Sequence, residues 1–177
     1  MDYQTNCFAD RGGMILTDKD AFCENIRLCE KVMYSLAFSI VRNESDAGEI
    51  ISESIYRAYK NIDTLKNENA FKPWILRIVH NTAVEMIRKN SKIIPMEETP
   101  EIVDDNSENE ITTKIALREA INHLKQPYRT VVVLFYYENL SVSKIAQITS
   151  TNMVAVKKQL SRARKMLREI LKEDFNG

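Results

Sequence analysis

Apolar side chains recur at intervals of three and four residues along most of this chain, and that spacing predicts amphipathic helices. The first helix is expected to begin at the T-x-x-D pattern of residues 17–20, a capping box, and to end near Arg42. Its apolar stripe consists of Phe22, Ile26, Cys29, Met33, Leu36 and Ile40.

The same spacing predicts two more helices before residue 91. The second has Ser45 and Asp46 as candidate N-caps. Its buried stripe is expected to be Ala47, Ile51, Ile55, Ala58 and Ile62. The third is expected to run from Ala70 to Lys89, with Pro73 in its first turn, where N–H groups have no partner within the helix. Its inner face is expected to be Phe71, Ile75, Ile78, Thr82 and Met86.

Helical spacing returns after residue 110. A helix is predicted at 111–124, and another begins at Pro127. Its inward residues are expected to be Val131, Val132 and Phe135. Residues 131–137 are β-prone by composition, but Pro127 and the neighbouring helices favour a helix. Asn139 is expected to end this helix in the left-handed conformation.

Two further helices complete the chain. Ser141 is the predicted cap of a short helix that contains Ile145 and Ala146, and residues 149–152 form a turn. The apolar stripe of the last helix is expected to be Met153, Val156, Leu160, Ala163 and Leu167.

The pattern stops in two places. Residues 1–17 show no period and are interpreted as an N-terminal tail; residues 91–110, with two prolines and no helical period, are interpreted as a linker. The predicted fold is therefore all-α, with two small helical domains, 18–90 and 111–177, joined by an acidic flexible linker. With only 4 Gly and 4 Pro in 177 residues, a turn-rich β fold is disfavoured.

Composition narrows the function classes. No uncharged stretch approaches the ~18 residues of a membrane span, and no signal peptide is evident, so a cytoplasmic protein without membrane insertion is expected. The three cysteines, Cys7, Cys23 and Cys29, form no C-x-x-C, and neither His80 nor His123 completes a ligand set with them. No metal, cofactor or disulfide is predicted.

Charge is balanced overall and uneven along the chain. The 25 basic and 25 acidic residues cancel, but residues 91–110 hold one basic and seven acidic residues, whereas residues 111–177 hold twelve and five. A basic module behind an acidic connector is typical of a tethered nucleic-acid-binding domain.

Residues 141–168 have the pattern of a helix-turn-helix, with the small Ala146 where the helices cross. The apolar stripe of the second helix leaves its cationic side chains exposed, where they can neutralise phosphates, and Arg162 can bind guanine bidentately. These exposed residues are Lys157, Lys158, Ser161, Arg162, Arg164, Lys165 and Arg168.

A second candidate surface surrounds the start of the third helix. Aromatic, amide and basic groups gather there, a combination that suits unstacked bases. The residues are Lys66, Asn67, Asn69, Phe71, Lys72, Trp74, Arg77, His80 and Asn81. The alternative is that Phe71 and Trp74 belong to the hydrophobic core.

Two long segments resemble known sequences. The first domain contains MYSLAFSIVRNESDAGEIISESIYRAYKNI and FKPWILRIVHNTAVEMIRK, which resemble the promoter-melting domain of extracytoplasmic-function (ECF) sigma factors. The second contains LREAINHLKQPYRTVVVLFYYENLSVSKIAQITSTNMVAVKKQLSRARKMLREIL, which resembles their helix-turn-helix domain. The resemblance covers roughly residues 20–172.

This resemblance implies a subunit that binds core RNA polymerase, through its clamp helices and flap, and directs it to promoter DNA. Asp46, Glu49, Ile50 and Glu53 match the surface that docks on the clamp helices. The loop at residues 66–71 and the next helix, including Asn81, match the part that captures flipped bases of the −10 element. The family's activity is usually held off by an anti-sigma factor.

The last helix matches the part of the family that recognises the −35 element. The residues concerned are Thr151, Asn152, Val154, Lys157, Lys158, Ser161, Arg162 and Lys165. The chain departs from the family at Gly48, where an acid is usual, at Ser52, where Gln is usual, and at Ser150, where Gly is usual. Val154 and Ala155 replace a common Gly-Thr pair, and Lys158 replaces a usual Ser.

Two other functions are alternatives. A helix-turn-helix repressor or activator would bind DNA without polymerase and would not need the 18–90 domain. A helical enzyme could use Glu49 and Glu53 as paired carboxylates, but no H-x-x-E, Cys–His pair or Gly-rich phosphate loop accompanies them. No catalytic residue is predicted.

Overall fold

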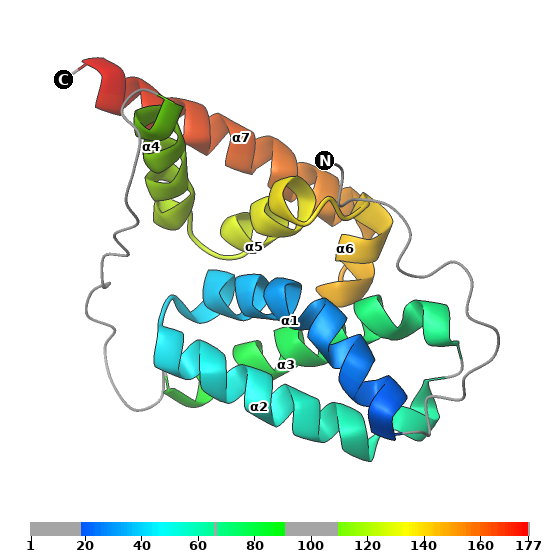
Figure 1. Cartoon of the computed structure of the whole chain (residues 1–177). Coiled ribbons are helices and arrows are strands. Elements are labelled where there is room, and N and C mark those ends of the chain that lie inside the picture. Colours follow the sequence, from blue (N-terminus) through cyan, green and yellow to red (C-terminus); the bar gives the residue numbers. More distant parts are fainter. Residues whose placement is uncertain (1–18, 66, 91–109, 177) are drawn as a thin grey trace.

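The computed structural model describes residues 19–65, 67–90 and 110–176, and these residues contain helices and turns but no strand (Figure 1). The first domain consists of α1 (Lys19–Val41), α2 (Glu44–Lys60) and α3 (Phe71–Asn90), with short 3-10 turns at Ile62–Thr64 and Glu68–Ala70. The second consists of α4 (Glu110–His123), α5 (Tyr128–Val132), a π-helical turn (Val133–Tyr137), α6 (Val142–Ile148) and α7 (Met153–Asn176). The prediction of two helical domains is confirmed. The predicted tail and all but the last residue of the predicted linker lie outside the described residues.

The N-terminus of α2 differs from the prediction. Asn43, in an extended conformation, caps the helix, and its side-chain oxygen accepts a hydrogen bond from the Asp46 N–H at 2.9 Å. Ser45 and Asp46 lie inside the helix, so their assignment as caps was wrong. The buried stripe is also rotated, because Ile50 and Ser54 are fully buried while Ile51 and Ile55 are only partly buried.

The core of the first domain lies where α1, α2 and α3 meet. Met33, Leu36, Phe71 and Ile75 have no solvent exposure, and the rings of Phe22 and Phe71 pack edge to face with centroids 6.0 Å apart. Cys29 is 1% exposed, and burial raises the pKa of its thiol to about 11. This thiol therefore stays protonated and unreactive at neutral pH.

Local signals in the second domain were mostly correct. Asn139 has a φ of 50°, as predicted for the residue that ends the preceding helical segment. The Ser141 hydroxyl accepts the Lys144 N–H at 3.3 Å, which confirms it as the cap of α6. The β-prone residues 131–137 are helical, and it is Leu134 rather than Phe135 that is fully buried.

The stripe of α7 begins later than predicted. Val156, Leu160 and Ala163 are buried, but Met153 is 53% exposed, so its assignment to the stripe was wrong. The apolar spacing of α7 extends to Met153, one turn beyond the part of the helix that neighbouring helices pack against. Spacing alone cannot indicate where this packing ends.

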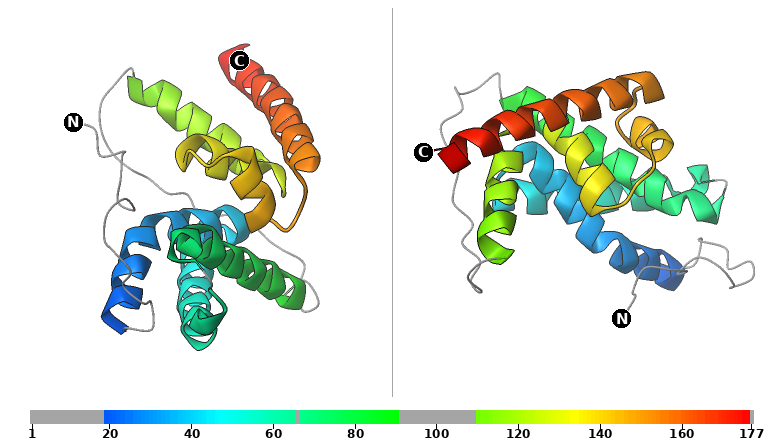
Figure 2. Two further views of the ribbon diagram at one scale, coloured as in Figure 1. Left: turned by 90° about the vertical axis from the view of Figure 1, so that its right-hand side faces the viewer. Right: turned by 90° about the horizontal axis from the view of Figure 1, so that it is seen from above.

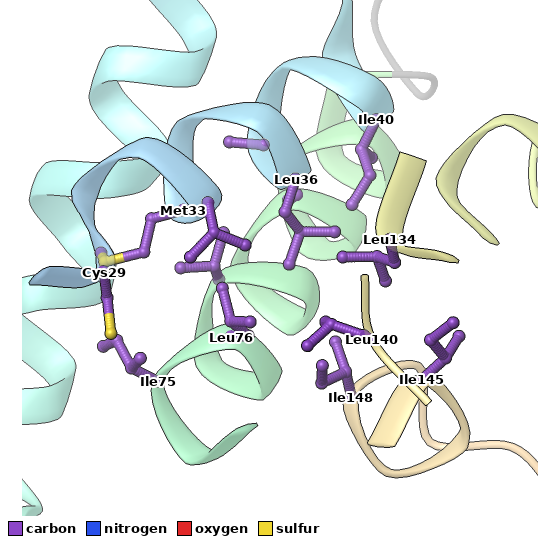
Figure 3. Packing of buried hydrophobic residues seen from close by; sticks show 14 of the residues in the cluster. Cys29, Met33, Leu36, Ile40, Ile75, Leu76, Leu134, Leu140, Ile145 and Ile148 are labelled. Atoms are coloured by element: carbon purple, nitrogen blue, oxygen red, sulfur yellow. The ribbon is translucent and has the colours of Figure 1, made fainter. Parts of the chain in front are cut away.

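The two domains pack against each other. α6 lies on α3, and α5 lies on the end of α1 (Figures 1 and 2). Figure 3 shows Leu36, Ile40 and Leu76 of the first domain facing residues of the second. Those second-domain residues are Leu134, Leu140, Ile145 and Ile148. One hydrophobic core thus runs through both domains.

A polar cluster joins α1 to α5 beside this core. The Arg129 Nε donates to the Ser39 carbonyl at 2.6 Å, and its Nη1 donates to the carbonyls of Asn122 and Leu124, each at 3.1 Å. The Gln126 amide also donates to the Ser39 carbonyl at 2.6 Å. Burial, and secondarily the charge of Arg42, lower the pKa of Arg129 to about 10, which leaves it protonated at neutral pH. We call Ser39, Gln126, Arg129 and Thr130 the interdomain cluster.

Candidate nucleic-acid interface

The first domain presents an acidic face on α2. Glu49 is exposed and Asp46 is partly exposed. Asp46 lies in the first turn of the helix, where negative charge is favourable. Ile50, which the resemblance placed on this face, is fully buried. Its side chain belongs to the core in this structure, because the side of α2 that carries Ile50 packs against α1 and α3.

Glu53 takes part in an ion-pair chain that links α2 to α3. The Arg57 Nε donates to Glu53 at 2.6 Å, and its Nη1 donates to Glu85 at 2.7 Å. These hydrogen bonds raise the pKa of Arg57, and the bond from Arg57 lowers the pKa of Glu85. The i, i+4 spacing of Glu53 and Arg57 was a signal for the first bond. No local signal indicated Glu85, which lies on another helix.

A face of α3 carries three of the predicted base-contacting residues. Trp74, Arg77 and Asn81 follow one another at spacings of three and four; Arg77 and Asn81 are exposed, and Trp74 is partly exposed. His80 Nδ1 lies 3.5 Å from Asn81 Oδ1. Burial lowers the pKa of His80 more than this contact raises it, so a neutral imidazole is favoured beside Asn81.

Phe71 does not reach this face. It has no exposed surface and packs against Trp74 with centroids 5.7 Å apart, so the core alternative was correct for Phe71. Asn67 and Asn69 are exposed in the preceding turn, where the Asn69 N–H donates to the Asn67 side chain at 3.0 Å. Lys72 is half-buried, and Lys66 lies outside the described residues.

The second domain contains the predicted helix-turn-helix, formed by α6, the turn at 149–152 and α7 (Figure 1). Ser150, at the position of the family's usual glycine, has a φ of 52°. The Asn152 side-chain oxygen accepts the Ala155 N–H at 2.8 Å and so caps α7. Asn152 was predicted to contact DNA, and in this structure its side-chain oxygen caps the helix.

The outer face of α7 is basic. The residues that the resemblance assigned to −35 recognition, two in the preceding turn and the rest on α7, are all exposed: Thr151, Asn152, Val154, Lys157, Lys158, Ser161, Arg162 and Lys165. Lys165 lies 4.0 Å from Glu169, the only acid that the sequence places between residues 152 and 172. The structure thus brings these residues together on one surface, whereas those proposed for the first domain are divided between surface and core.

Comparison with known proteins decides the family. A Sigma-70 region 2 model matches residues 26–93, and a Sigma-70 region 4 model matches residues 114–167. RNA polymerase sigma factor SigV of Bacillus subtilis is 37% identical over 145 residues, which are 81% of this chain and 87% of that protein. The chain belongs to the ECF group of sigma-70 factors. ECF RNA polymerase sigma factor SigW of the same organism is 29% identical over 177 residues, covering 88% of this chain and 91% of that protein.

Solved structures show the same fold. The co-crystal structure of the sigma factor RpoE with the anti-sigma factor NepR from Bartonella quintana matches with a TM-score of 0.73 at 21% identity, over 88% of this chain and 98% of that one. CnrH in complex with the cytosolic domain of CnrY matches with a TM-score of 0.66 at 19% identity, over 89% and 91% of the two chains.

The family is one of transcription initiation factors and has no established enzymatic activity. In the described part of this ECF factor, no helix is long and apolar enough to cross a membrane, and no three His, Cys, Asp or Glu side chains gather as metal ligands do.

Proposed function

We propose that this chain binds core RNA polymerase and directs it to a specific class of promoters, with its three surfaces divided between protein and DNA. The observation that carries the proposal is the opposite charge of two exposed helix faces in family-matched regions, acidic on α2 and basic on α7. The cytoplasm is the expected location, because bacterial polymerase and chromosome lie there.

The acidic face of α2 is assigned to polymerase. Asp46 and Glu49 would repel DNA phosphates but would attract a basic groove on a protein. Glu53 is already paired with Arg57, so it contributes less charge to such a groove than the other two carboxylates.

The α3 face and α7 are assigned to DNA. Trp74 offers a surface on which a base can stack, Asn81 offers both a donor and an acceptor to a base edge, and Arg77 can contact phosphate. On α7, Arg162 can bind guanine bidentately, whereas Lys158 is assigned to phosphate.

Simultaneous use of both DNA surfaces requires the two domains to separate. The −10 and −35 elements lie about 25 base pairs apart, or about 85 Å of duplex at 3.4 Å per base pair. A compact chain of this length has a radius of gyration of only about 16 Å. Lys72 and Lys144 also line one small cavity between α3 and α6, so the packed domains place two cations close together.

Regulation by an anti-sigma factor is also proposed. Two proteins with this fold were solved in complexes with protein partners, and one of these complexes is of a sigma factor with an anti-sigma factor. Such a partner of this chain should compete with core polymerase. A candidate that binds the chain without lowering its affinity for polymerase would contradict this part of the proposal.

Run-off transcription tests the main proposal. The chain, added to the core polymerase of Bacillus subtilis with a genomic promoter library, should yield transcripts from a defined promoter class. A helix-turn-helix regulator would instead bind promoters without polymerase and produce no transcript with the core enzyme. That outcome would reject the proposed function.

A charge reversal tests the α2 surface. Asp46→Lys with Glu49→Lys should weaken core polymerase binding at least about tenfold, or about 1.4 kcal/mol, because both changes oppose a basic groove. Glu24→Lys with Glu30→Lys, on the exposed side of α1, is the matched control and should leave affinity unchanged. Equal affinities for the two double variants in a titration would remove this assignment.

A further inference from the structure

Val154 is the most exposed of the large apolar side chains in the described residues, at 62%. It is the second residue of α7, immediately after the turn of the helix-turn-helix. Single exposed apolar side chains are common on protein surfaces, so its exposure alone assigns no role. Its position on the helix does.

Val154 lies on the outer face of α7. Val154, Lys158, Ser161 and Lys165 follow one another at spacings of four, three and four, which aligns them along one side of the helix, and all four are exposed. Val156, Leu160 and Ala163 are buried on the opposite side. A recognition helix presents the N-terminal residues of its outer face to base edges in the major groove. Val154 is the first residue of that face.

The oxygen of the neighbouring polar side chain already accepts a hydrogen bond. The Asn152 side-chain oxygen accepts the Ala155 N–H, so the group that could otherwise accept a hydrogen bond from a base caps the helix. Val154 itself can neither donate nor accept. The apolar group that base pairs display in the major groove is the C5-methyl of thymine.

We propose that Val154 contacts a thymine methyl group and so makes thymine the preferred base at one position of the −35 element. This inference rests on the proposed function and adds a specificity-determining residue to it. A glycine is common at this position in the ECF pattern, and glycine has no side chain with which to make this contact. Lys157 and Lys158, both exposed one turn later, hold the helix on the phosphates.

The test compares thymine with uracil, which differ by this methyl group alone. Holoenzyme made from the full chain and Bacillus subtilis core polymerase selects promoter fragments randomised over eight base pairs of the upstream element. Each thymine in the selected sequence is then replaced by uracil, one position at a time, and affinity is measured. One replacement should weaken wild-type binding about fourfold, which corresponds to losing the burial of one methylene-sized group.

Variants assign this effect to Val154. Holoenzyme with Val154→Ala should bind fragments with thymine or uracil at that position equally well. In the selection, this variant should show no base preference at that position and should keep its preferences at the other positions. Val154→Thr, which keeps one of the two methyl groups, should retain part of the difference. Leu117→Ala, an exposed apolar truncation on α4 of the same domain, is the matched control and should behave like wild type.

The outcomes separate this inference from the proposed function. If every uracil fragment binds like its thymine counterpart, or if Val154→Ala keeps the full difference, Val154 does not contact a methyl group. If Val154→Ala weakens holoenzyme formation without changing base preference, the side chain contacts polymerase instead, and the inference is rejected. Selection of no sequence at all would reject the proposed function, and this inference with it.

Discussion

Asn81 is the single residue on which the proposed promoter opening depends most directly. Its side chain is exposed on the same face of α3 as Arg77, and its neighbour His80 is kept neutral by burial. The Asn81 amide can donate to and accept from a base edge, and the neutral His80 ring places no charge beside it. Such a site suits a base that has been released from its stack.

Asn81→Ala should therefore reduce run-off transcription from a duplex promoter by a factor corresponding to roughly 1–3 kcal/mol of lost base contact. The defect should largely disappear on a template already mismatched over the −10 element, because opening then costs nothing. An equal defect on both templates, or a lowered urea midpoint, would indicate a folding role for Asn81.

At the scale of the element, α2 combines the proposed docking surface with a helix-weakening residue. Gly48 is exposed in the first half of the helix, and a Cβ added there would have no heavy atom within 4 Å. Glycine costs backbone entropy in a helix, and an added methyl group would meet no steric conflict.

Gly48→Ala should raise the free energy of unfolding by about 0.4–1 kcal/mol in urea titrations monitored by circular dichroism. Gly48→Glu should bind core polymerase more tightly than Gly48→Ala, because it restores the carboxylate that the ECF pattern has at this position. The alanine variant controls for helix stability, so equal affinities would show that charge here does not contribute to docking.

At the scale of the whole molecule, the two domains share one core, although the sequence indicated two separate modules. Leu36, Ile40 and Leu76 pack against Leu134 and its neighbours (Figure 3). Domains that bury each other's apolar surface unfold together, since the unfolding of either domain exposes the apolar surface that it covered on the other.

We expect one unfolding transition. Trp74 is the single tryptophan and reports on the first domain, whereas circular dichroism reports on all helices. The two signals should have the same urea midpoint. Leu134→Ala, in the second domain, should lower both midpoints, because it should reduce the free energy of unfolding by about 2–5 kcal/mol. A Trp74 midpoint unaffected by this variant would mean that the domains fold independently.

Separation of the domains during initiation can be tested at the interdomain cluster. The hydroxyl oxygens of Ser39 and Thr130 lie 3.2 Å apart across the interface, so cysteines at these positions come within reach of a disulfide. Ser39→Cys with Thr130→Cys, in a chain with Cys7 and Cys23 replaced by Ser, should lose run-off activity on oxidation and regain it on reduction. Cys29, with its pKa raised to about 11, stays out of this chemistry. Full activity of the oxidised chain would contradict the need for separation.

The elements themselves were predictable because their causes are local. Spacings of three and four, the Ser141 cap and the left-handed Asn139 each depend on residues within a few positions of one another. The basic face of α7 was predictable for the same reason, since the positions of the cations relative to the apolar stripe of the same 24-residue helix follow from their spacing in the sequence. The exposed faces of α2 and α3 were predicted only in part.

What could not be predicted depends on residues far apart in the chain. Whether Ile50 or Ile51 is buried, and whether Phe71 lies on the surface, depends on where two other helices lie. Glu85 meets Arg57 across 28 residues, and Thr130 meets Ser39 across 91. Such pairs leave no periodic signal, because helical spacing records which side of a helix is apolar and carries no record of what covers that side. The partner of each face is selected only when all the helices pack and their apolar surfaces leave water together.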